Sequence, residues 1–323
     1  MEVGLMPSRV PSVRSGSGAK RTSAVADPAY QAVTAGLKGE VQFNASLKEW
    51  TSFRIGGPAD VLVVPHDVGD LCRLLRQARV AKIPLFVMGG TNVLIRDGGI
   101  RGVVVSLSKL KAIVDESDSV VYAEGGVTMP VLLQHSITRS LSGLEWAAGI
   151  PGTVAGCVVM NAGTRLGEMK DAVKAVRIVS PSGTLKDVPA STIPFSYRRA
   201  RVPRGIVAGV WLQLKPGVKN KIQTIVKDYL RYRKDTQPLT MPNAGCAFKN
   251  PKPDAAGQLI EAAGLKGFRV GDAQVSEKHA NFIVNRGDAR ADDVMELIAQ
   301  VRRTVEEKTG VKLQLELKVV GEP

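Results

Sequence analysis

The chain has 323 residues, of which 44% are apolar, 23% are charged and only 5% are aromatic. This composition is ordinary for a globular protein of two or three domains, and it excludes an intrinsically disordered chain. The 44 Lys and Arg residues outnumber the 30 Asp and Glu residues, and the resulting net charge of +14 favours an anionic partner. No apolar run approaches the ~18 residues of a membrane-spanning helix, and the amino terminus lacks the apolar block of a signal peptide, so we expect a cytoplasmic protein without membrane insertion.

Residues 1–36 are predicted to form a flexible, basic tail. They are rich in Ser, Gly, Pro and Ala and lack apolar periodicity, as is typical of a segment without a core of its own. Arg9, Arg14, Lys20 and Arg21 outnumber Glu2 there, but most of the positive excess lies beyond the tail. We therefore interpret the tail as a passive extension.

The first half of the chain contains short apolar runs broken by Gly and Pro, which predict strands. Strands are expected at residues 61–64, 85–88, 103–107, 120–123, 175–179 and 206–214. Apolar residues at helical spacing run from Val68 to Ala78, with Asp67 placed to cap the helix, so a strand-helix-strand unit is expected. A second helix is predicted near Thr128, with Pro130 in its first turn.

The second half is predicted to contain two helices and a final strand. Ile222, Val226 and Leu230 belong to one amphipathic stripe, and we expect this helix to link two domains. A helix is also expected from Asp292 to Lys308, because acidic residues begin it and Gly310 ends it. Residues 313–319 alternate leucine and valine with polar residues, the pattern of a half-buried strand.

Two glycine-rich segments favour a bound cofactor. Residues 89–92, Gly-Gly-Thr-Asn, follow a predicted strand, and such a turn can aim successive N–H groups at a phosphate, although a plain turn uses the same residues. Residues 149–156 form a second glycine-rich segment that leads to Asn161. Neither contains GxGxxG, and the chain has no P-loop sequence, which disfavours a nicotinamide Rossmann domain and an NTPase.

Residues 242–251, Pro-Asn-Ala-Gly-Cys-Ala-Phe-Lys-Asn-Pro, place Cys246 in a tight turn suited to presenting its thiol. The alternative is a buried, inert cysteine, which describes Cys72 and Cys157 better because they lie among apolar residues. The three cysteines are odd in number and far apart, so they predict neither a disulfide framework nor a CxxC site. His279 lacks a second ligand at suitable spacing, and no metal is expected.

Six motifs follow one another along the chain: Thr51-Ser52-Phe53-Arg54-Ile55-Gly56-Gly57-Pro58-Ala59-Asp60, the Gly89 loop, Gly149-Ile150-Pro151-Gly152, Phe195-Ser196-Tyr197-Arg198, Gly245-Cys246-Ala247-Phe248 and Lys278-His279-Ala280-Asn281-Phe282. Their order resembles that of the UDP-N-acetylenolpyruvoylglucosamine reductases, bacterial flavoenzymes of peptidoglycan synthesis. The resemblance runs from about residue 46 to 321. It looks closer to the shorter (type II) form of the family, because few residues separate Arg198 from the strand at Ile206.

The resemblance implies an α+β fold with a two-subdomain FAD-binding domain of the vanillyl-alcohol-oxidase (PCMH) type, followed by an α+β substrate-binding domain. The expected boundaries are residues 37–110 and 111–217 for the two FAD-binding subdomains and residues 218–323 for the substrate domain. The implied partners are FAD, NADPH and a UDP-sugar, which are all polyanions and would match the net positive charge.

The implied reaction passes hydride from FAD, reduced by NADPH, to the enolpyruvyl ether of the UDP-sugar and gives UDP-N-acetylmuramate. Arg198 would hold the substrate carboxylate while charge develops on it, although a solvated basic loop is the alternative. Cys246, at a position where many members of the family carry Ser, would donate a proton to the carbanionic carbon. Glu316 would hold the enolpyruvyl group or relay a proton, although a surface ion pair with neighbouring lysines is the default from sequence alone.

The resemblance also implies binding residues. The expected cofactor-binding residues are Arg54, Gly89, Gly90, Thr91, Asn92, Gly149, Gly152, Thr153, Gly156 and Asn161. The expected substrate-binding residues are Tyr197, Arg231, Lys278, His279 and Asn281. For Arg231, an exposed helical face is an equally simple explanation.

Two other classes of protein stay open. One is a different FAD-linked oxidoreductase of the same fold, which would oxidise an alcohol with oxygen. The other is a nucleic-acid-binding protein, suggested by the basic composition. Its scattered basic residues, few interleaved aromatics and lack of an RRM, KH or zinc-finger pattern argue against nucleic acid as the partner.

Overall fold

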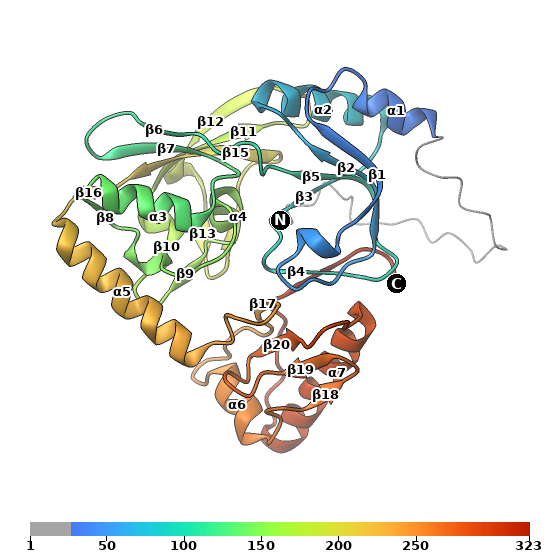
Figure 1. Ribbon diagram of the computed structural model, residues 1–323, viewed down its shortest axis with the longest axis vertical. Helices are drawn as coiled ribbons and strands as arrows, with labels where there is room; N and C mark the ends of the chain where they lie inside the picture. Colours follow the sequence, from blue (N-terminus) through green and yellow to red (C-terminus); the bar gives the residue numbers. More distant parts are fainter. Residues whose placement is uncertain (1–26) are drawn as a thin grey trace. The chain divides into compact units, whose positions relative to one another are not determined.

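The computed structural model describes residues 27–323, so residues 1–26 of the predicted tail lie outside the described residues. The chain forms two compact units (Figure 1). Of the described residues, unit 1 comprises 27–45, 59–88 and 101–223, and unit 2 comprises 46–58, 89–100 and 224–323. In residues 27–323, no helix has the length and apolar character needed to cross a membrane.

The segment just before unit 1's first strand differs from the sequence prediction. Helix α1, Pro28–Thr34, occupies positions that were assigned to the tail. Asp27 caps it by accepting from the Ala29 N–H, and Pro28 stands in its first turn, where the missing N–H costs nothing. The Tyr30 hydroxyl donates to Asp60 at 2.7 Å, and Val33 is fully buried, so the tertiary contacts explain a helix that the composition did not predict.

The first sheet of unit 1 has the strand order β1-β2-β5-β3. Its strands are β1, Glu40–Ser46, β2, Pro58–Val64, β3, Leu85–Met88, and β5, Ile100–Ser106. Helix α2, Val68–Ala81, connects β2 to β3 and begins at Asp67, whose side chain accepts from the Asp70 N–H. The predicted strand-helix-strand unit and its cap are confirmed.

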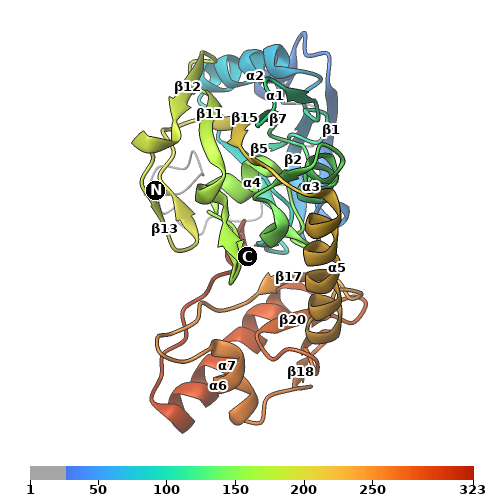
Figure 2. The ribbon, with the colours of Figure 1, turned by 90° about the vertical axis from the view of Figure 1, so that its left-hand side faces the viewer.

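The second sheet of unit 1 is antiparallel, in the order β12-β11-β15-β7-β6. Its strands are β6, Ile113–Asp115, β7, Val120–Glu124, β11, Val173–Val179, β12, Leu185–Pro189, and β15, Ile206–Gln213. Helix α4, Val154–Val159, packs against β15 and β7 (Figure 2). Helix α3, Met129–Thr138, begins at Thr128 with Pro130 in its first turn, as predicted.

Short elements complete unit 1. Strand β8 (Leu141–Ser142) pairs with β16 (Lys215–Pro216). Strand β9 (Gly163–Thr164) pairs with β10 (Gly167–Glu168), and β13 (Phe195–Ser196) pairs with β14 (Arg199–Ala200). Three-residue 3-10 helices occur at Glu145–Ala147, Met169–Asp171 and Ala190–Thr192 in this unit and at Lys48–Trp50 in unit 2.

Unit 2 contains a four-stranded antiparallel sheet in the order β17-β20-β19-β18. Its strands are β17, Asn243–Cys246, β18, Arg269–Val270, β19, Ala273–Val275, and β20, Phe282–Asn285. Helix α7, Ala291–Thr309, packs against β18, β19 and helix α6, Ala256–Ala262 (Figures 1 and 2). Helix α5, Lys219–Thr236, carries the chain from unit 1 into unit 2.

Two segments of unit 2 from the first half of the chain, residues 46–58 and 89–100, share the core of its carboxyl-terminal part. Phe53, Ile55 and Leu94 belong to one buried cluster with Phe248 and Leu297. In addition, β4, Val93–Ile95, pairs in parallel with β21, Lys318–Val320. The contacts therefore join segments that are far apart in sequence.

The predicted final strand is interrupted. Leu315 forms only an isolated bridge with Phe248, and β21 begins at Lys318. The N–H groups of Glu316 and Leu317 both donate to Ala247 O, which breaks the regular ladder. Leu313 and Leu317 are nevertheless buried, so the apolar pattern predicted which side chains enter the core but not the continuous strand.

Candidate active site

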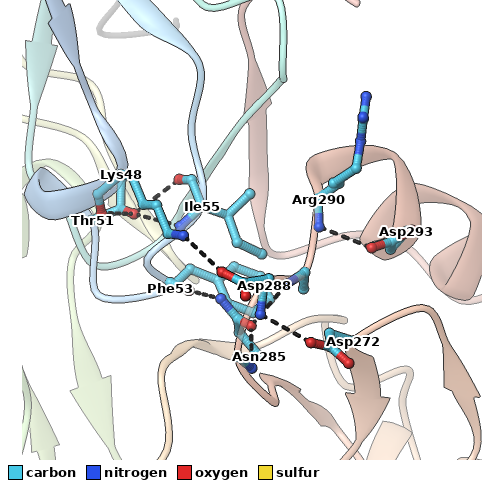
Figure 3. Close-up of polar contacts among 11 residues, drawn as sticks. Lys48, Thr51, Phe53, Ile55, Asp272, Asn285, Asp288, Arg290 and Asp293 are labelled. Carbon is cyan, nitrogen blue, oxygen red and sulfur yellow. Dashed lines mark hydrogen bonds and ion pairs between the residues drawn. The ribbon is translucent and has the colours of Figure 1, made fainter.

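Residues 51–55 form a loop that presents Arg54. Phe53 and Ile55 are buried, whereas Arg54 is exposed and has a φ of +55°. The Thr51 hydroxyl donates to Ile55 O at 3.0 Å and accepts from Ile55 N at 3.3 Å, which closes the loop on itself (Figure 3). The fold thus anchors the residues on both sides of the arginine and leaves its guanidinium toward solvent.

The Gly89 loop lies next to that segment. Ser52 N donates to Gly90 O at 2.8 Å. Gly90 has a φ of +76°, and a Cβ at this position would come within 2.8 Å of Trp50 O, so only glycine suits this close approach. The exposed Arg54 cation beside a glycine turn offers the donor types that suit a diphosphate, which fits the FAD expected from the sequence.

Asn92, at the end of this loop, contacts the carboxyl-terminal segment of unit 2. Its side-chain amide donates to Glu316 O at 3.2 Å, and Lys318 N donates to Asn92 O at 3.2 Å. The structure therefore links one predicted cofactor-binding residue to the backbone of a predicted catalytic residue within unit 2.

The second glycine segment forms a turn before α4. Gly149 and Gly152 have φ values of +73° and +101°. Thr153 is the N-cap of α4, and its hydroxyl accepts from Gly156 N at 3.2 Å, so these two predicted cofactor residues contact each other. The bond between them shapes the turn.

Arg198 lies in the turn between β13 and β14, directly after Tyr197. Its Nη1 donates to Gly163 O at 2.8 Å, and its guanidinium carbon lies 5.3 Å from the centre of the Tyr197 ring. Asn161, which is 1% exposed, donates to Ser196 O at 3.1 Å and to Glu168 at 2.8 Å, and its oxygen accepts from Lys170 N. Unit 1 thus brings Arg198 and Asn161 into one contact network.

Cys246 ends strand β17 and is partly exposed, whereas Cys72 and Cys157 are buried. Burial raises the pKa of Cys157 to about 12 and also raises the pKa of Cys72, as expected for inert thiols. Gly245, with a φ of +78°, precedes Cys246, and its N–H donates to Asn243 Oδ1 at 2.9 Å. Of the three thiols, the one predicted to react is therefore the accessible one.

The backbone of Glu316 is bonded to the segment that carries Cys246, although the two residues are far apart in sequence. Its N–H donates at 2.9 Å to the carbonyl of Ala247, the residue that follows Cys246. Arg233, on α5, is 8% exposed and donates to Gln237 at 2.9 Å. Burial lowers the pKa of the Arg233 guanidinium, while the neighbouring Tyr229 and Cys246 oppose that shift. Unit 2 therefore contains a buried cation, the candidate thiol and the candidate carboxylate.

The Lys278 motif mainly supports neighbouring backbone. The Asn281 amide donates to Phe248 O at 2.8 Å and accepts from Phe248 N at 2.9 Å, and this residue is 2% exposed. Lys278 donates to Lys234 O near the end of α5 at 2.6 Å. His279 Nδ1 accepts from Asn281 N, and burial lowers the pKa of its imidazole. Arg231 and Tyr197 are exposed, with Tyr197 57% exposed.

Other features of residues 27–323 lie away from these residues. A hollow of about 380 Å³ in unit 1 is lined in part by Asp115, Asp118 and Arg139, and none of the predicted site residues lines it. Within this described part, no group of three or more His, Cys, Asp or Glu side chains is placed to hold a metal ion.

Sequence reasoning missed three residues that organise the site. Asn285 donates to Phe53 O at 3.1 Å, Ser52 donates to Asn243 O at 2.7 Å, and Asn243 itself donates to Met241 O at 2.7 Å. The available signal was local: Asn243 precedes Gly245 and Asn285 precedes Gly287, and asparagine two residues before a glycine is typical of an Asx turn.

The fold and these loops define a flavoprotein. Residues 59–189 match the family model described as an FAD binding domain, and residues 237–320 match the model described as UDP-N-acetylenolpyruvoylglucosamine reductase, C-terminal domain. The chain is therefore an FAD-containing oxidoreductase with a PCMH-type flavin domain, followed by the carboxyl-terminal domain of that reductase.

The relatives identify the family. The UDP-N-acetylenolpyruvoylglucosamine reductase of Moorella thermoacetica is 45% identical and covers 89% of this chain and 95% of its own. That of Caldanaerobacter subterraneus is 42% identical over 88% of this chain and 95% of its own. The crystal structure of the Thermus caldophilus enzyme (MurB) has a TM-score of 0.75 and 38% identity, and covers 88% of this chain and 99% of that chain. The chain belongs to the UDP-N-acetylenolpyruvoylglucosamine reductase family.

Proposed function

We propose that the chain catalyses the NADPH-dependent reduction of UDP-N-acetylenolpyruvoylglucosamine to UDP-N-acetylmuramate, a step in the synthesis of peptidoglycan precursors. The single observation that supports the assignment of residues is the hydrogen bond from Glu316 N to Ala247 O, which holds the backbone of Glu316 next to the segment of the accessible thiol Cys246. Bound FAD supplies the hydride after its reduction by NADPH. The roles of this chain's own residues follow from where charge and protons must go.

Hydride addition to the methylene carbon of the enolpyruvyl group leaves negative charge on the neighbouring carbon and on its carboxylate. We assign Arg198 to the carboxylate, because a guanidinium can form two parallel hydrogen bonds to it while its charge grows. The bond from Arg198 Nη1 to Gly163 O and the adjacent Tyr197 ring restrict the orientation of the arginine. We assign the exposed Tyr197, together with Arg231, to contacts with the substrate.

Cys246 is proposed as the acid that protonates the carbanionic carbon. The S–H bond breaks, the new C–H bond forms, and the electron pair of the S–H bond stays on sulfur as thiolate. A thiol carries a transferable proton, so Cys246 can serve as this acid. The positive Arg233 close to Cys246 would favour the negative charge that the step leaves on sulfur.

Glu316 is proposed to hold the enolpyruvyl group or to relay a proton to Cys246. Its backbone is held by Ala247 O and by the Asn92 amide, so Asn92 positions Glu316 in addition to any contact with the cofactor. Asn281 is assigned a similar role toward Cys246, because its amide binds both backbone groups of Phe248. Lys278 and His279 stay candidates for the substrate.

The residues predicted from sequence to bind the flavin stay proposals, and each set is described within its own unit. Arg54, Gly89, Gly90 and Thr91 supply a cation and an open glycine turn in unit 2. Gly149, Gly152, Thr153, Gly156 and Asn161 supply the glycine-rich turn in unit 1 and its supports. The domain boundaries proposed from sequence, at residues 37–110, 111–217 and 218–323, stay proposals. A cytoplasmic location and a role in cell-wall formation, cell shape and division follow from the proposed substrate.

The experiment that tests this function follows the flavin absorbance of the purified protein under anaerobic conditions. NADPH is added first and UDP-N-acetylenolpyruvoylglucosamine second. Bleaching followed by stoichiometric recovery is the expected result. Bleaching without recovery would retain the flavoprotein and reject this substrate, and reoxidation only by oxygen would indicate a different FAD-linked oxidase.

A further inference from the structure

Residues 51–55 alternate between buried and exposed positions in a way that presents one cation. Thr51, Phe53 and Ile55 are 5%, 1% and 2% exposed, whereas Ser52 and Arg54 are exposed. The three buried side chains anchor the loop in the core of unit 2. The direction of the Arg54 side chain is therefore set by the backbone between two fixed residues.

That backbone is in a conformation that an arginine rarely adopts. Arg54 has a φ of +55°, in the left-handed region, which persists only where surrounding contacts impose it. Arg54 N donates to Thr51 O at 3.1 Å, and the Thr51 hydroxyl bonds both backbone groups of Ile55. These contacts hold the loop from within but do not fix the carbonyl of Phe53.

The Phe53 carbonyl is fixed by Asn285 at the end of β20. Asn285 Nδ2 donates to Phe53 O at 3.1 Å, and Asn285 Oδ1 accepts from Gly287 N at 2.9 Å and from Ala289 N at 3.1 Å (Figure 3). Asn285 is 2% exposed, so each of these bonds is shielded from water. Because the Phe53 carbonyl and the Arg54 N–H share one peptide plane, this bond sets the plane from which the φ of Arg54 is measured.

The loop of residues 51–55 also contacts the Gly89 loop and the strand that carries Cys246, both in unit 2. Ser52 N donates to Gly90 O at 2.8 Å, and the Ser52 hydroxyl donates at 2.7 Å to the carbonyl of Asn243, at the start of the strand that ends at Cys246. A shift of the loop would therefore change the glycine turn and the Cys246 strand together.

We infer that Asn285 is a positioning residue for flavin binding: by fixing the Phe53 carbonyl it directs the Arg54 guanidinium toward the anionic diphosphate of the cofactor. Retention of the flavin consequently depends on a residue of the carboxyl-terminal part of the chain, outside residues 59–189 that match the FAD binding domain. This inference rests on the proposed assignment of Arg54 to the cofactor.

The test measures the dissociation constant for FAD by flavin fluorescence, with the full-length chain stripped of flavin and then titrated. Arg54→Ala should weaken FAD binding about 10- to 100-fold, because it removes a charged hydrogen-bond donor. Asn285→Ala should weaken it about tenfold. In the double variant, Asn285→Ala should add nothing to the loss caused by Arg54→Ala, since it acts through that side chain.

Additive losses of FAD affinity in the double variant would overturn the inference, because they would show that Asn285 acts independently of Arg54. An unchanged FAD affinity in Asn285→Ala would overturn it as well. If Asn285→Ala does not fold, Thr51→Val gives the same double-variant test, since it removes the hydroxyl that closes the loop. Thr51→Ser keeps that hydroxyl and should restore binding.

Lys48→Ala is the matched control. It removes the Lys48–Asp288 ion pair at 3.2 Å beside the same loop, but both side chains are well exposed, so FAD affinity should not change. A loss as large as that of Asn285→Ala would show that any contact of this loop matters and would contradict the specific role of Asn285. Reoxidation of the reduced flavin by the UDP-sugar is measured separately. Failure of that reaction would therefore leave the test of FAD affinity unaffected.

Discussion

The Arg198 hairpin of unit 1 and the Cys246 strand of unit 2 position their candidate catalytic side chains in different ways. Arg198 bonds back to the fold through its own guanidinium, which donates to Gly163 O. Cys246 is placed by backbone and neighbours, through Gly245 and Asn243 before it and Asn281 behind Phe248. A side chain that supports its own position cannot be changed without changing structure, whereas one placed by its neighbours can.

The largest expected effect comes from the side chain that its neighbours place. Cys246→Ala should slow reoxidation of the flavin by the UDP-sugar by ~10²- to 10⁴-fold, because it removes the proposed acid. Flavin reduction by NADPH and the melting temperature should stay near those of the wild type. Stopped-flow absorbance would measure both half-reactions, with Cys246→Ser as the control that keeps a proton donor. Normal reoxidation in Cys246→Ala would refute the acid assignment.

Arg198→Lys should combine a kinetic loss with a structural one. A lysine keeps the charge but lacks the planar fork, so reoxidation should slow by ~10²-fold. Loss of the bond to Gly163 O should also lower the free energy of unfolding by about 1 kcal/mol. The same stopped-flow measurement, paired with denaturant unfolding, would check both effects. A kinetic loss without any destabilisation would remove the contrast with Cys246.

Asp70 is a reference for the two candidate catalytic residues, because its side chain has only a structural role. Burial by itself would raise the pKa of Asp70, but hydrogen bonds from the N–H groups of Lys38, His66 and Gly39 together lower it. Asp70→Asn should therefore cost about 2 kcal/mol of stability at neutral pH. A carboxylate with a depressed folded-state pKa stabilises the fold above its unfolded pKa, and this contribution is lost as the pH falls.

The measurement is the free energy of unfolding of both proteins against pH. The difference in the free energy of unfolding between wild type and Asp70→Asn should have its full value at neutral pH. It should shrink as the pH falls from the ordinary aspartate pKa of 3.8 toward the lower pKa of the folded state. A gap independent of pH would show that the charge of Asp70 does not contribute.

The smallest expected effect concerns backbone strain at the two arginines. Arg54 and Arg198 have φ values of +55° and +56°, which glycine adopts without strain. Arg54→Gly should stabilise the flavin-free protein by up to about 1 kcal/mol, whereas Arg198→Gly should not, because it also removes the bond to Gly163 and the Tyr197 contact. Thermal unfolding of the two variants tests this; equal shifts would mean that the Arg198 contacts add no stability.

The sequence by itself determined the elements whose signals are local. The helices observed at 68–81, 129–138 and 291–309 were predicted at residues 68–78, from near Thr128 and at residues 292–308, and the strand at 85–88 was predicted from its apolar run. The class of enzyme also followed from the sequence, because six motifs in order carry that information without any knowledge of contacts. Burial of Cys72 and Cys157 was also predicted from a local signal, since both lie among apolar neighbours in the sequence.

Only the tertiary structure decided how distant segments support one another. Sequence reasoning missed α1, whose stability comes from contacts such as that between Tyr30 and Asp60, and it joined residues 313–319 into one strand although Ala247 interrupts the ladder. Asn92 and Asn281 stay predicted ligand-binding residues, and the structure adds that their amides bind the backbone of Glu316 and Phe248. A side-chain amide can bond any backbone group that the fold brings near, and periodicity carries no information about which group that is.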